Sequence, residues 1–418
     1  MEGLSMVKRR LLKVVVVSVA LAVAPPPAWA QQSSPNWTSC NNEGDTVARD
    51  VQIAACTAII SARGSSKDLA IAYNNRGLAY YKSGDDNHAI ADFDQSINLN
   101  AQNPLVFINR GNAYNDKGAY DAAIANFRNA IFINPRLAGA LAGRGDAELG
   151  KDQYDLASSD FEQAIGLDPK LAAAYDGRGS VYTHKGDYDH AIADYNQAIA
   201  LDPKFARAFN NRGNVYLFKR DYDHAIADYT TAIGISPQYK LAFFDRAIAY
   251  GRKGDLDRGI ADYTEAIRLD PQYEAAYHNR GLLYRRKGDY EHAMADFDQA
   301  IKISPQDASA YTNRCWTRIS FGRDLSSALP DCDQSVKLAR DANAYDNRCD
   351  LYYKLDQFDN AIADCTTALS LDPKYAGSLY VRGLAKRKKG DPTGAADIAA
   401  AKAIQATVDT EYAGYGIK

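Results

Sequence analysis

The chain has 418 residues, of which 46% are hydrophobic and 24% are charged, and its formal net charge at pH 7 is −3. This composition is that of a folded soluble protein, and the length accommodates either two or three compact domains or one extended repeat array. The excess of acidic residues argues against nucleic acid or anionic lipid as a partner, because both attract basic surfaces.

The first thirty residues differ from the rest of the chain. Four basic residues in MVKRRLLK precede an apolar run from Val14 to Ala24, and the small-residue pattern AWA ends at Ala30. This order is typical of a secretory signal peptide, and the apolar run is shorter than the ~20 residues that a membrane-spanning helix needs. Residues 1–30 are therefore predicted to be cleaved after Ala30. The mature protein is expected to be periplasmic or secreted, without a membrane span and with a net charge near −6.

Residues 31–69 are predicted to form an N-terminal half-repeat cap. They hold Cys40 and Cys56, and the stretch VQIAACTAII parallels NAIADCTTAL near the end of the chain. The sequence contains six cysteines. In an exported protein, an even number of cysteines indicates disulfides.

Residues 70–392 repeat with a period of 34. In most repeats a tyrosine follows a small residue by three positions, alanine or glycine follows it by twelve and an aromatic residue by sixteen, and a proline closes the repeat. The register is set by an arginine and the small residue after it, at Arg76-Gly77, Arg110-Gly111, Arg144-Gly145, Arg178-Gly179, Arg212-Gly213, Arg246-Ala247, Arg280-Gly281, Arg314-Cys315, Arg348-Cys349 and Arg382-Gly383.

These spacings predict a helical hairpin in every repeat. Steps of three and four are helical, a Gly-Asp turn separates the two halves, and the closing proline stops the second helix. One hairpin cannot bury its aromatic residues alone, so neighbouring hairpins are expected to stack around one continuous core.

The pattern of small-x-x-Tyr, Ala-x-x-x-aromatic and terminal proline at period 34 resembles the tetratricopeptide repeat over residues 70–392. The large apolar residue that this family usually carries before the small residue is arginine here in all ten repeats. The resemblance implies an all-α fold, a right-handed superhelical solenoid of stacked hairpins. It also implies a concave face that binds peptides or partner proteins.

The cysteines are predicted to staple individual hairpins. With Gly77 taken as position 8 of its repeat, positions 8 and 24 face each other across the hairpin, with Cα atoms about 4–6 Å apart. That separation suits a disulfide, whereas buried free thiols are the alternative. The expected pairs are Cys40–Cys56, Cys315–Cys332 and Cys349–Cys365.

Two polar rows follow the repeat. The arginines at position 7 could line a basic ligand groove or pair internally with the aspartates at position 23, and we favour internal pairs because a guanidinium binds two acceptors. Asparagine recurs at position 6 although it is a poor helix former. It could bind the backbone of a peptide in the concave groove or bond to the neighbouring helix. The candidate groove residues are Asn75, Asn109, Asn211, Asn279, Asn313 and Asn347.

The eighth repeat and the C-terminal end depart from the pattern. Trp316 and Arg318 are unusual for their positions, and Pro330 falls inside the expected second helix, so we predict a shortened or kinked helix there. Residues 393–418 lose the aromatic pattern and are expected to form a C-terminal capping helix and a tail that cover the last hydrophobic face.

The sequence predicts a non-catalytic exported scaffold that binds peptide or protein segments on its concave face. It has no catalytic motif and no cysteine spacing typical of zinc, so neither an enzyme nor a metal or other cofactor is expected. We expect a monomer with a protein or peptide partner. Two alternatives remain: an envelope or carbohydrate-associated accessory or enzyme with its site at the eighth repeat, and a structural spacer without a ligand.

Overall fold

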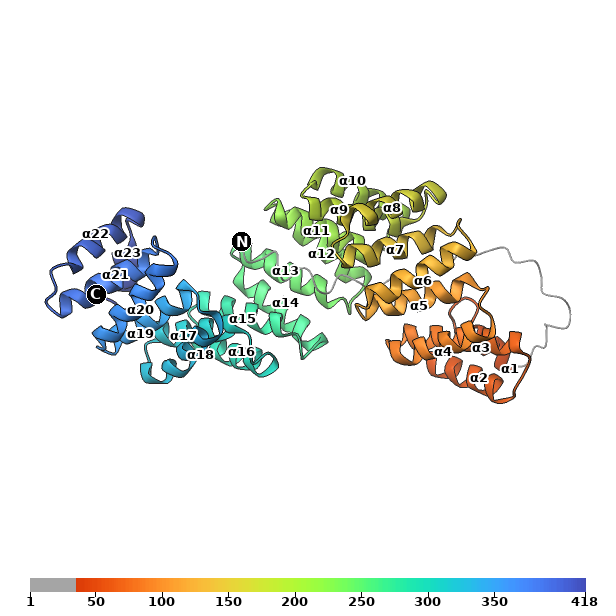
Figure 1. The fold of residues 1–418 in the computed structure, drawn as a ribbon, viewed down its shortest axis with the longest axis horizontal. Coiled ribbons are helices and arrows are strands. Elements are labelled where there is room, and N and C mark those ends of the chain that lie inside the picture. Colours follow the sequence, from red (N-terminus) through yellow and green to blue (C-terminus); the bar gives the residue numbers. More distant parts are fainter. Residues whose placement is uncertain (1–34) are drawn as a thin grey trace. The chain divides into compact units, whose positions relative to one another are not determined.

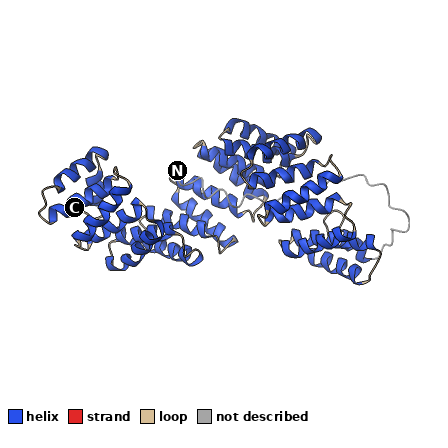
Figure 2. Ribbon diagram, in the orientation of Figure 1, coloured by secondary structure: helices blue, strands red, loops and turns tan. Residues whose placement is uncertain are grey.

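The structure is a computed structural model that describes residues 35–418, so the predicted signal peptide lies outside the described residues. All regular structure in this range is helical, as Figure 2 shows. The helices form successive hairpins, and the predicted all-α solenoid class is confirmed. No helix between residues 35 and 418 is both long enough and apolar enough to cross a membrane.

The chain divides into two compact units, with the boundary between Val215 and Tyr216. Figure 1 labels the helices of both units. The helices that begin in the first unit are α1 (Pro35–Asn41), α2 (Arg49–Ser61), α3 (Ser66–Lys82), α4 (Asp86–Leu99), α5 (Pro104–Asp116), α6 (Tyr120–Ile133), α7 (Ala138–Gly150), α8 (Tyr154–Leu167), α9 (Ala172–Lys185), α10 (Tyr188–Leu201) and α11 (Ala206–Phe218). Those of the second unit are α12 (Tyr222–Ile235), α13 (Lys240–Lys253), α14 (Leu256–Leu269), α15 (Glu274–Arg286), α16 (Tyr290–Ile303), α17 (Ala308–Phe321), the 3-10 helix η3 (Leu325–Ala328), α18 (Leu329–Ala339), α19 (Ala342–Lys354), α20 (Phe358–Leu371), α21 (Ala376–Lys388), α22 (Gly394–Ile404) and α23 (Val408–Gly414).

The hairpin of α9 and α10 illustrates why each repeat folds as it does. Gly186 ends α9 at φ +78°, a left-handed conformation that glycine adopts without strain. The side chain of Asp187 then accepts a hydrogen bond from the backbone N–H of His190 and caps α10. Asp202 leaves α10 in an extended conformation, and Pro203 follows it. An extended residue before proline is expected, because proline disfavours a helical neighbour.

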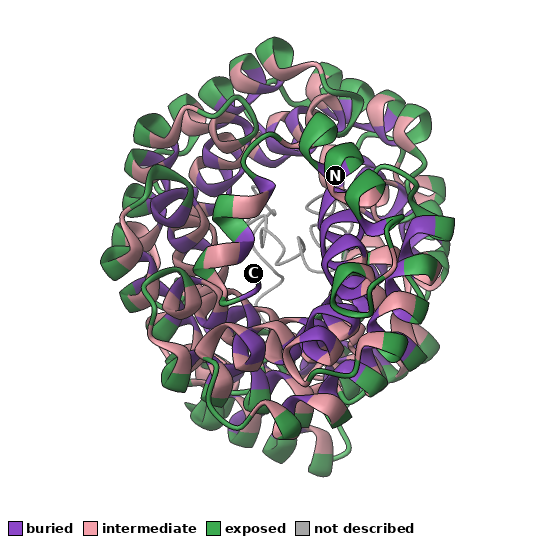
Figure 3. Cartoon of the chain, turned by 90° about the vertical axis from the view of Figure 1, so that its left-hand side faces the viewer, coloured by how far each residue is buried: buried purple, intermediate pink, exposed green. Residues whose placement is uncertain are grey.

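In several hairpins the core is a glycine on the first helix facing an aromatic ring on the second. A Cβ atom added at Gly145 would lie 2.9 Å from Cε1 of Phe161, and one added at Gly179 would lie 2.9 Å from Cε1 of Tyr195. Both rings are buried. The ring therefore fills the space that the glycine leaves, as the spacing of sixteen predicted. Figure 3 shows the resulting stripes, with the packed side of each helix buried and the loops exposed.

The three predicted cysteine pairs are the pairs in the structure. The Cα–Cα distances are 4.8 Å for Cys40–Cys56, 5.2 Å for Cys315–Cys332 and 5.4 Å for Cys349–Cys365, and no cysteine in residues 35–418 is free. The last two pairs occupy the glycine and ring positions of their repeats. Cysteine at both positions thus replaces one large side chain by two small ones and a bond.

The second helix of the eighth repeat is shortened, as the proline predicted. The segment before it forms η3, and α18 begins at Leu329 with Pro330 in its first turn, where a missing N–H costs nothing. Arg318 donates to both Asp331 and Ser327 across this junction. Cys315 and Cys332 are 17 residues apart, one more than Cys349 and Cys365, and the extra residue is absorbed by the 3-10 turn that Arg318 holds.

The C-terminal end departs in part from the expectation. Helix α22 packs against α21 and closes the last hairpin. Residues 408–418, which we call the tail, also contact α21 and reach the side chains of α19 and α17. The tail thus lies on earlier repeats rather than only on the end of the array.

Candidate functional site

The first helices of the hairpins form the surface on which the candidate residues lie. Within the first unit α5 contacts α7 and α7 contacts α9; within the second, α15, α17, α19 and α21 contact one another in order. We call the side of these helices that faces away from the second helices the A-helix face. In the second unit, repeats 7, 8, 9 and 10 begin with α15, α17, α19 and α21.

The arginine row is engaged between helices. In most repeats Nε and Nη2 of the arginine donate to the two carboxylate oxygens of the aspartate on the second helix, and in several the third nitrogen reaches the second helix of the preceding repeat. The forked pairs are Arg76–Asp92, Arg144–Asp160, Arg178–Asp194, Arg246–Asp262, Arg280–Asp296, Arg314–Asp331, Arg348–Asp364 and Arg382–Asp397. These guanidinium groups join helices, which is the internal pairing that we favoured from the sequence.

The asparagine row lies at the contacts between neighbouring first helices. Where a partner is present, the amide nitrogen contacts a side chain 34 or 35 residues earlier, on the preceding first helix. These contacts are Asn75 with Asn41 (3.0 Å), Asn109 with Asn74 (3.0 Å), Asn211 with Asp176 (3.0 Å) and Asn313 with His278 (3.2 Å). Asn279 is half-buried, and Asn347 is buried. The bond to a neighbouring helix is thus present at four positions, and the groove role stays a proposal.

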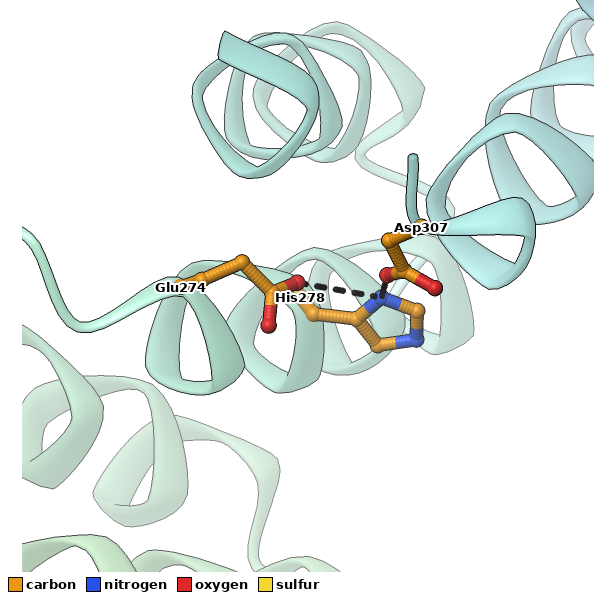
Figure 4. A group of neighbouring side chains, drawn as sticks. All are labelled: Glu274, His278 and Asp307. Carbon is orange, nitrogen blue, oxygen red and sulfur yellow. Dashed lines mark ion pairs between the residues drawn. The ribbon is translucent and has the colours of Figure 1, made fainter. Parts of the chain in front are cut away.

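Three ionisable side chains of the second unit converge at one point of this face (Figure 4). Nδ1 of His278 lies 3.9 Å from Oε1 of Glu274 and 3.8 Å from Oδ2 of Asp307, and these three atoms are buried without hydrogen bonds. Burial lowers the pKa of His278, and burial together with the charge of Asp307 raises the pKa of Glu274 to about 7.

The hydrogen bonds of Asn313 decide what this cluster can bind. Its Oδ1 accepts from Arg285 and its Nδ2 donates to the carbonyl of Ser309, which fixes the amide with its NH₂ group toward Nε2 of His278. Nε2 is then the acceptor, and the proton of the neutral imidazole is on Nδ1. A nitrogen that carries a proton offers no lone pair to a metal. With the proton on Nδ1, the geometry suits a hydroxyl or water that accepts from Nδ1 and donates to a carboxylate.

The A-helix face of repeats 8–10 holds the tail through its main chain. Nζ of Lys354 donates to the carbonyl oxygen of Tyr415 (2.7 Å) and to that of Ile319 (2.8 Å). The hydroxyl of Tyr353 donates to the main-chain oxygen of Lys418 (2.6 Å). Side chains of this face thus bind the backbone of a peptide segment, a mode that does not depend on the side chains of that segment.

Aromatic contacts hold the same segment from two other repeats. The rings of Trp316 and Tyr415 meet edge to face with centroids 4.9 Å apart, and Tyr380 packs against Tyr412 at 5.6 Å. Such pairs contribute about 0.5–1.5 kcal/mol beyond the area they bury. Trp316, noted in the sequence as an irregular residue, therefore has a partner in the tail.

Sequence reasoning missed Tyr353 and Lys354, and it expected the tail to cover only the last hydrophobic face. The same pair occurs as Tyr81-Lys82 in the first repeat, and a lysine recurs as Lys388 in the tenth, but most repeats hold other residues at these two positions, so the repeat pattern does not single them out. The available signal was the variation of these two positions along the array, because most repeats carry unrelated residues there. Positions that vary within a regular array are those that the fold does not dictate.

Comparison with known families supports the repeat assignment. Family models described as "TPR repeat" or "Tetratricopeptide repeat" match residues 77–118, 111–151, 138–171, 179–218, 206–239, 244–308 and 342–375, which together span more than half of the chain.

Three solved structures illustrate the similarity. The protein YrrB, described as a TPR protein with an unusual peptide-binding site, is 24% identical over 44% of this chain and 95% of its own, with a TM-score of 0.36. The TPR protein TTC0263 of Thermus thermophilus is 24% identical over 42% of this chain and 96% of its own, with a TM-score of 0.40. A chain of the APC/C hetero-tetramer Cut9–Hcn1 is 14% identical over 91% of this chain and 95% of its own, with a TM-score of 0.47.

Proposed function

The chain belongs to the tetratricopeptide repeat family, and we propose that it is a non-catalytic, exported scaffold that binds peptide segments of a partner protein on its A-helix face. The observation that carries the proposal is the tail. Lys354 and Tyr353 donate to its main-chain oxygens, so the face is already suited to hold a peptide.

Export is supported by the cysteines. All six are paired as disulfides within single hairpins, and such bonds persist in oxidising compartments outside the cytosol. Together with the N-terminal pattern of charges, apolar residues and AWA, they favour the periplasm or the exterior.

The eighth repeat gives no support to a second function. Arg318 holds the 3-10 junction, and Trp316 contacts the tail. Both irregular residues thus have structural partners, and we propose no enzyme site there.

Selection of peptides from a random display library against the immobilised full chain tests the proposal. One variant changes the three asparagines of the first unit to alanine (Asn75, Asn109, Asn211), and another changes those of the second (Asn279, Asn313, Asn347). We expect each selected peptide to lose about tenfold or more in affinity with one of the two variants, because a lost amide contact of ~1.4 kcal/mol is a factor of ten.

Gln299→Ala and Lys302→Ala are the matched controls. Both residues are exposed on α16, on the other side of the hairpin, and their removal should leave the affinity unchanged. Peptides that bind both asparagine variants as tightly as the wild type would refute the groove assignment. Circular dichroism of each variant should show unchanged helix content.

A further inference from the structure

Three apolar residues anchor the tail in the second unit. Val408 and Ile417 are fully buried and Tyr412 is 8% exposed, and all three join the core cluster that contains Cys349, Tyr353 and Tyr380. Burial of this depth ties a segment to the residues that cover it, whereas a segment that is not tied down is poorly ordered. The tail is therefore a docked segment.

Gly377 on α21 is shaped to receive the tail. A Cβ atom at this position would lie 2.0 Å from the hydroxyl oxygen of Tyr412. Glycine inside a helix costs about 0.5–1 kcal/mol relative to alanine, so its presence calls for a close approach. Tyr412 makes that approach, and the fit links the sequence of the face to the sequence of the tail.

Two carboxyl groups lie beneath the docked tail. Asp346 is 4% exposed and accepts a hydrogen bond from the hydroxyl of Ser378 (2.5 Å). Asp350, one helical turn further along α19, is fully buried, and neither of its oxygens has a hydrogen bond. Lys354 is the nearby cation, but its ammonium group donates to the carbonyls of Ile319 and Tyr415. Burying a carboxyl group without a partner is costly. The pair Asp346 and Asp350, which we call the acidic floor, therefore suits a positively charged occupant better than the tail.

We propose that the tail is a releasable occupant of the A-helix face of repeats 8–10, and that its release exposes Asp346 and Asp350 as the site for a lysine or arginine side chain of the partner segment. The inference rests on the proposed peptide-binding function and specifies its ligand. A cationic side chain supplies the donors that Asp350 lacks. Tyr353, Tyr380 and Trp316, no longer in contact with the tail, supply apolar contacts to the partner segment.

The pH dependence supports the same arrangement. Burial raises the pKa of Asp346 to about 7, against the hydrogen bonds of Ser378 and Tyr412, and burial raises that of Asp350 as well, with Asp346 adding to the shift. The other ionisable groups facing this pair are Lys354, Tyr375, Tyr412 and Tyr415. Because the docked state holds the protons more tightly, docking is strongest below pH ~4 and weakens as the pH rises through about 7.

A labelled copy of the tail, residues 407–418, is the probe for release. Fluorescence anisotropy should show weak binding to the wild-type full chain, whose own tail fills the site. The full-chain variants Tyr412→Ser and Ile417→Ser, made separately, should bind the probe about tenfold or more tightly, because one polar substitution at a buried anchor costs at least ~1.4 kcal/mol of docking. Adding Gly377→Leu to either variant should abolish the gain, since a side chain there excludes Tyr412 of the probe. The gain should be larger at pH 5 than at pH 8.

A second probe tests the acidic floor. This probe has the tail sequence with arginine in place of Tyr412. Its affinity for the Tyr412→Ser chain should fall about tenfold or more when Asp346→Asn and Asp350→Asn are added to that chain. The affinity of the unmodified probe should not fall with those changes, because the two asparagines carry no charge that the probe would have to bury. If the first probe binds the wild type and both tail variants with equal affinity, the proposal that the tail is releasable is wrong. If the affinity of the arginine probe does not change with Asp346→Asn/Asp350→Asn, the proposal of a site for a cationic side chain is wrong. In either case peptides selected on the full chain would still test the proposed function separately, by their response to the asparagine variants.

Discussion

Replacing Arg280 by methionine is expected to lower the free energy of unfolding by about 3 kcal/mol. Its guanidinium donates two hydrogen bonds to Asp296, at 2.8 and 2.7 Å, and a third to Thr264 on the preceding hairpin. Asp296 is 4% exposed, so the variant leaves a carboxylate buried without its cation. Methionine keeps the length of the side chain, which limits the loss of packing.

Lys287→Met is the matched control in the same pair of hairpins. Lys287 pairs with Asp257, but the two side chains are 40% and 82% exposed, and such a pair contributes less than about 1 kcal/mol. The double variant Arg280→Met/Asp296→Leu should recover most of the loss, because no carboxylate remains to be buried. Since repeat arrays can unfold in parts, urea unfolding should be fitted with a nearest-neighbour model. A loss for Arg280→Met no larger than that for Lys287→Met would contradict the account of the arginine row.

The loss of stability in Arg280→Met should depend on pH in a defined direction. Burial raises the pKa of Asp296 even beside Arg280, and removing the guanidinium raises it further. A carboxyl group that binds its proton more tightly when folded favours the folded state at low pH. The deficit of Arg280→Met should therefore be small near pH 4 and grow as the pH rises toward 8.

Removing the disulfide of the ninth repeat is expected to have the second large effect. Cys349–Cys365 closes a loop of separation 16, and cross-linking such a loop stabilises a protein by about 3 kcal/mol in the chain-entropy model. Cys349→Ala/Cys365→Ala should cost that amount and about 1 kcal/mol more, because it also leaves a cavity in the core.

The chain itself offers the control for the cavity. Other repeats fill the same space with a glycine and a tyrosine, as Gly179 and Tyr195 do. Cys349→Gly/Cys365→Tyr should therefore be more stable than the double alanine variant while lacking the cross-link. Adding reductant should lower the stability of the wild type and leave the Gly/Tyr variant without a further loss at this site. Six free thiols in the unfolded, unreduced wild type would contradict the pairing outright.

The repeat and everything tied to its register could be predicted from the sequence. A strict period of 34 places Cys349 opposite Cys365 and Arg280 opposite Asp296, because both pairs are sixteen residues apart across one hairpin. Local geometry sets such contacts, and the helical rise and the turn suffice to locate them.

Contacts between repeats were harder to predict. The amide of Asn211 contacts Asp176, and the third nitrogen of Arg280 reaches Thr264. Both depend on how far one hairpin rotates relative to the next, which no spacing in a single sequence encodes. The tail posed the same difficulty, since its anchors follow no repeat and their partners lie on three different hairpins.

Hydrogen–deuterium exchange of the wild-type chain tests the central claim most directly. If residues 408–418 occupy the A-helix face of repeats 8–10, the peptide covering α23 should exchange slowly at pH 5, and it should exchange at least about tenfold faster in Gly377→Leu, which cannot receive Tyr412. Fast exchange of this segment in the wild type, equal to that in Gly377→Leu, would show that the tail is free and would contradict the account.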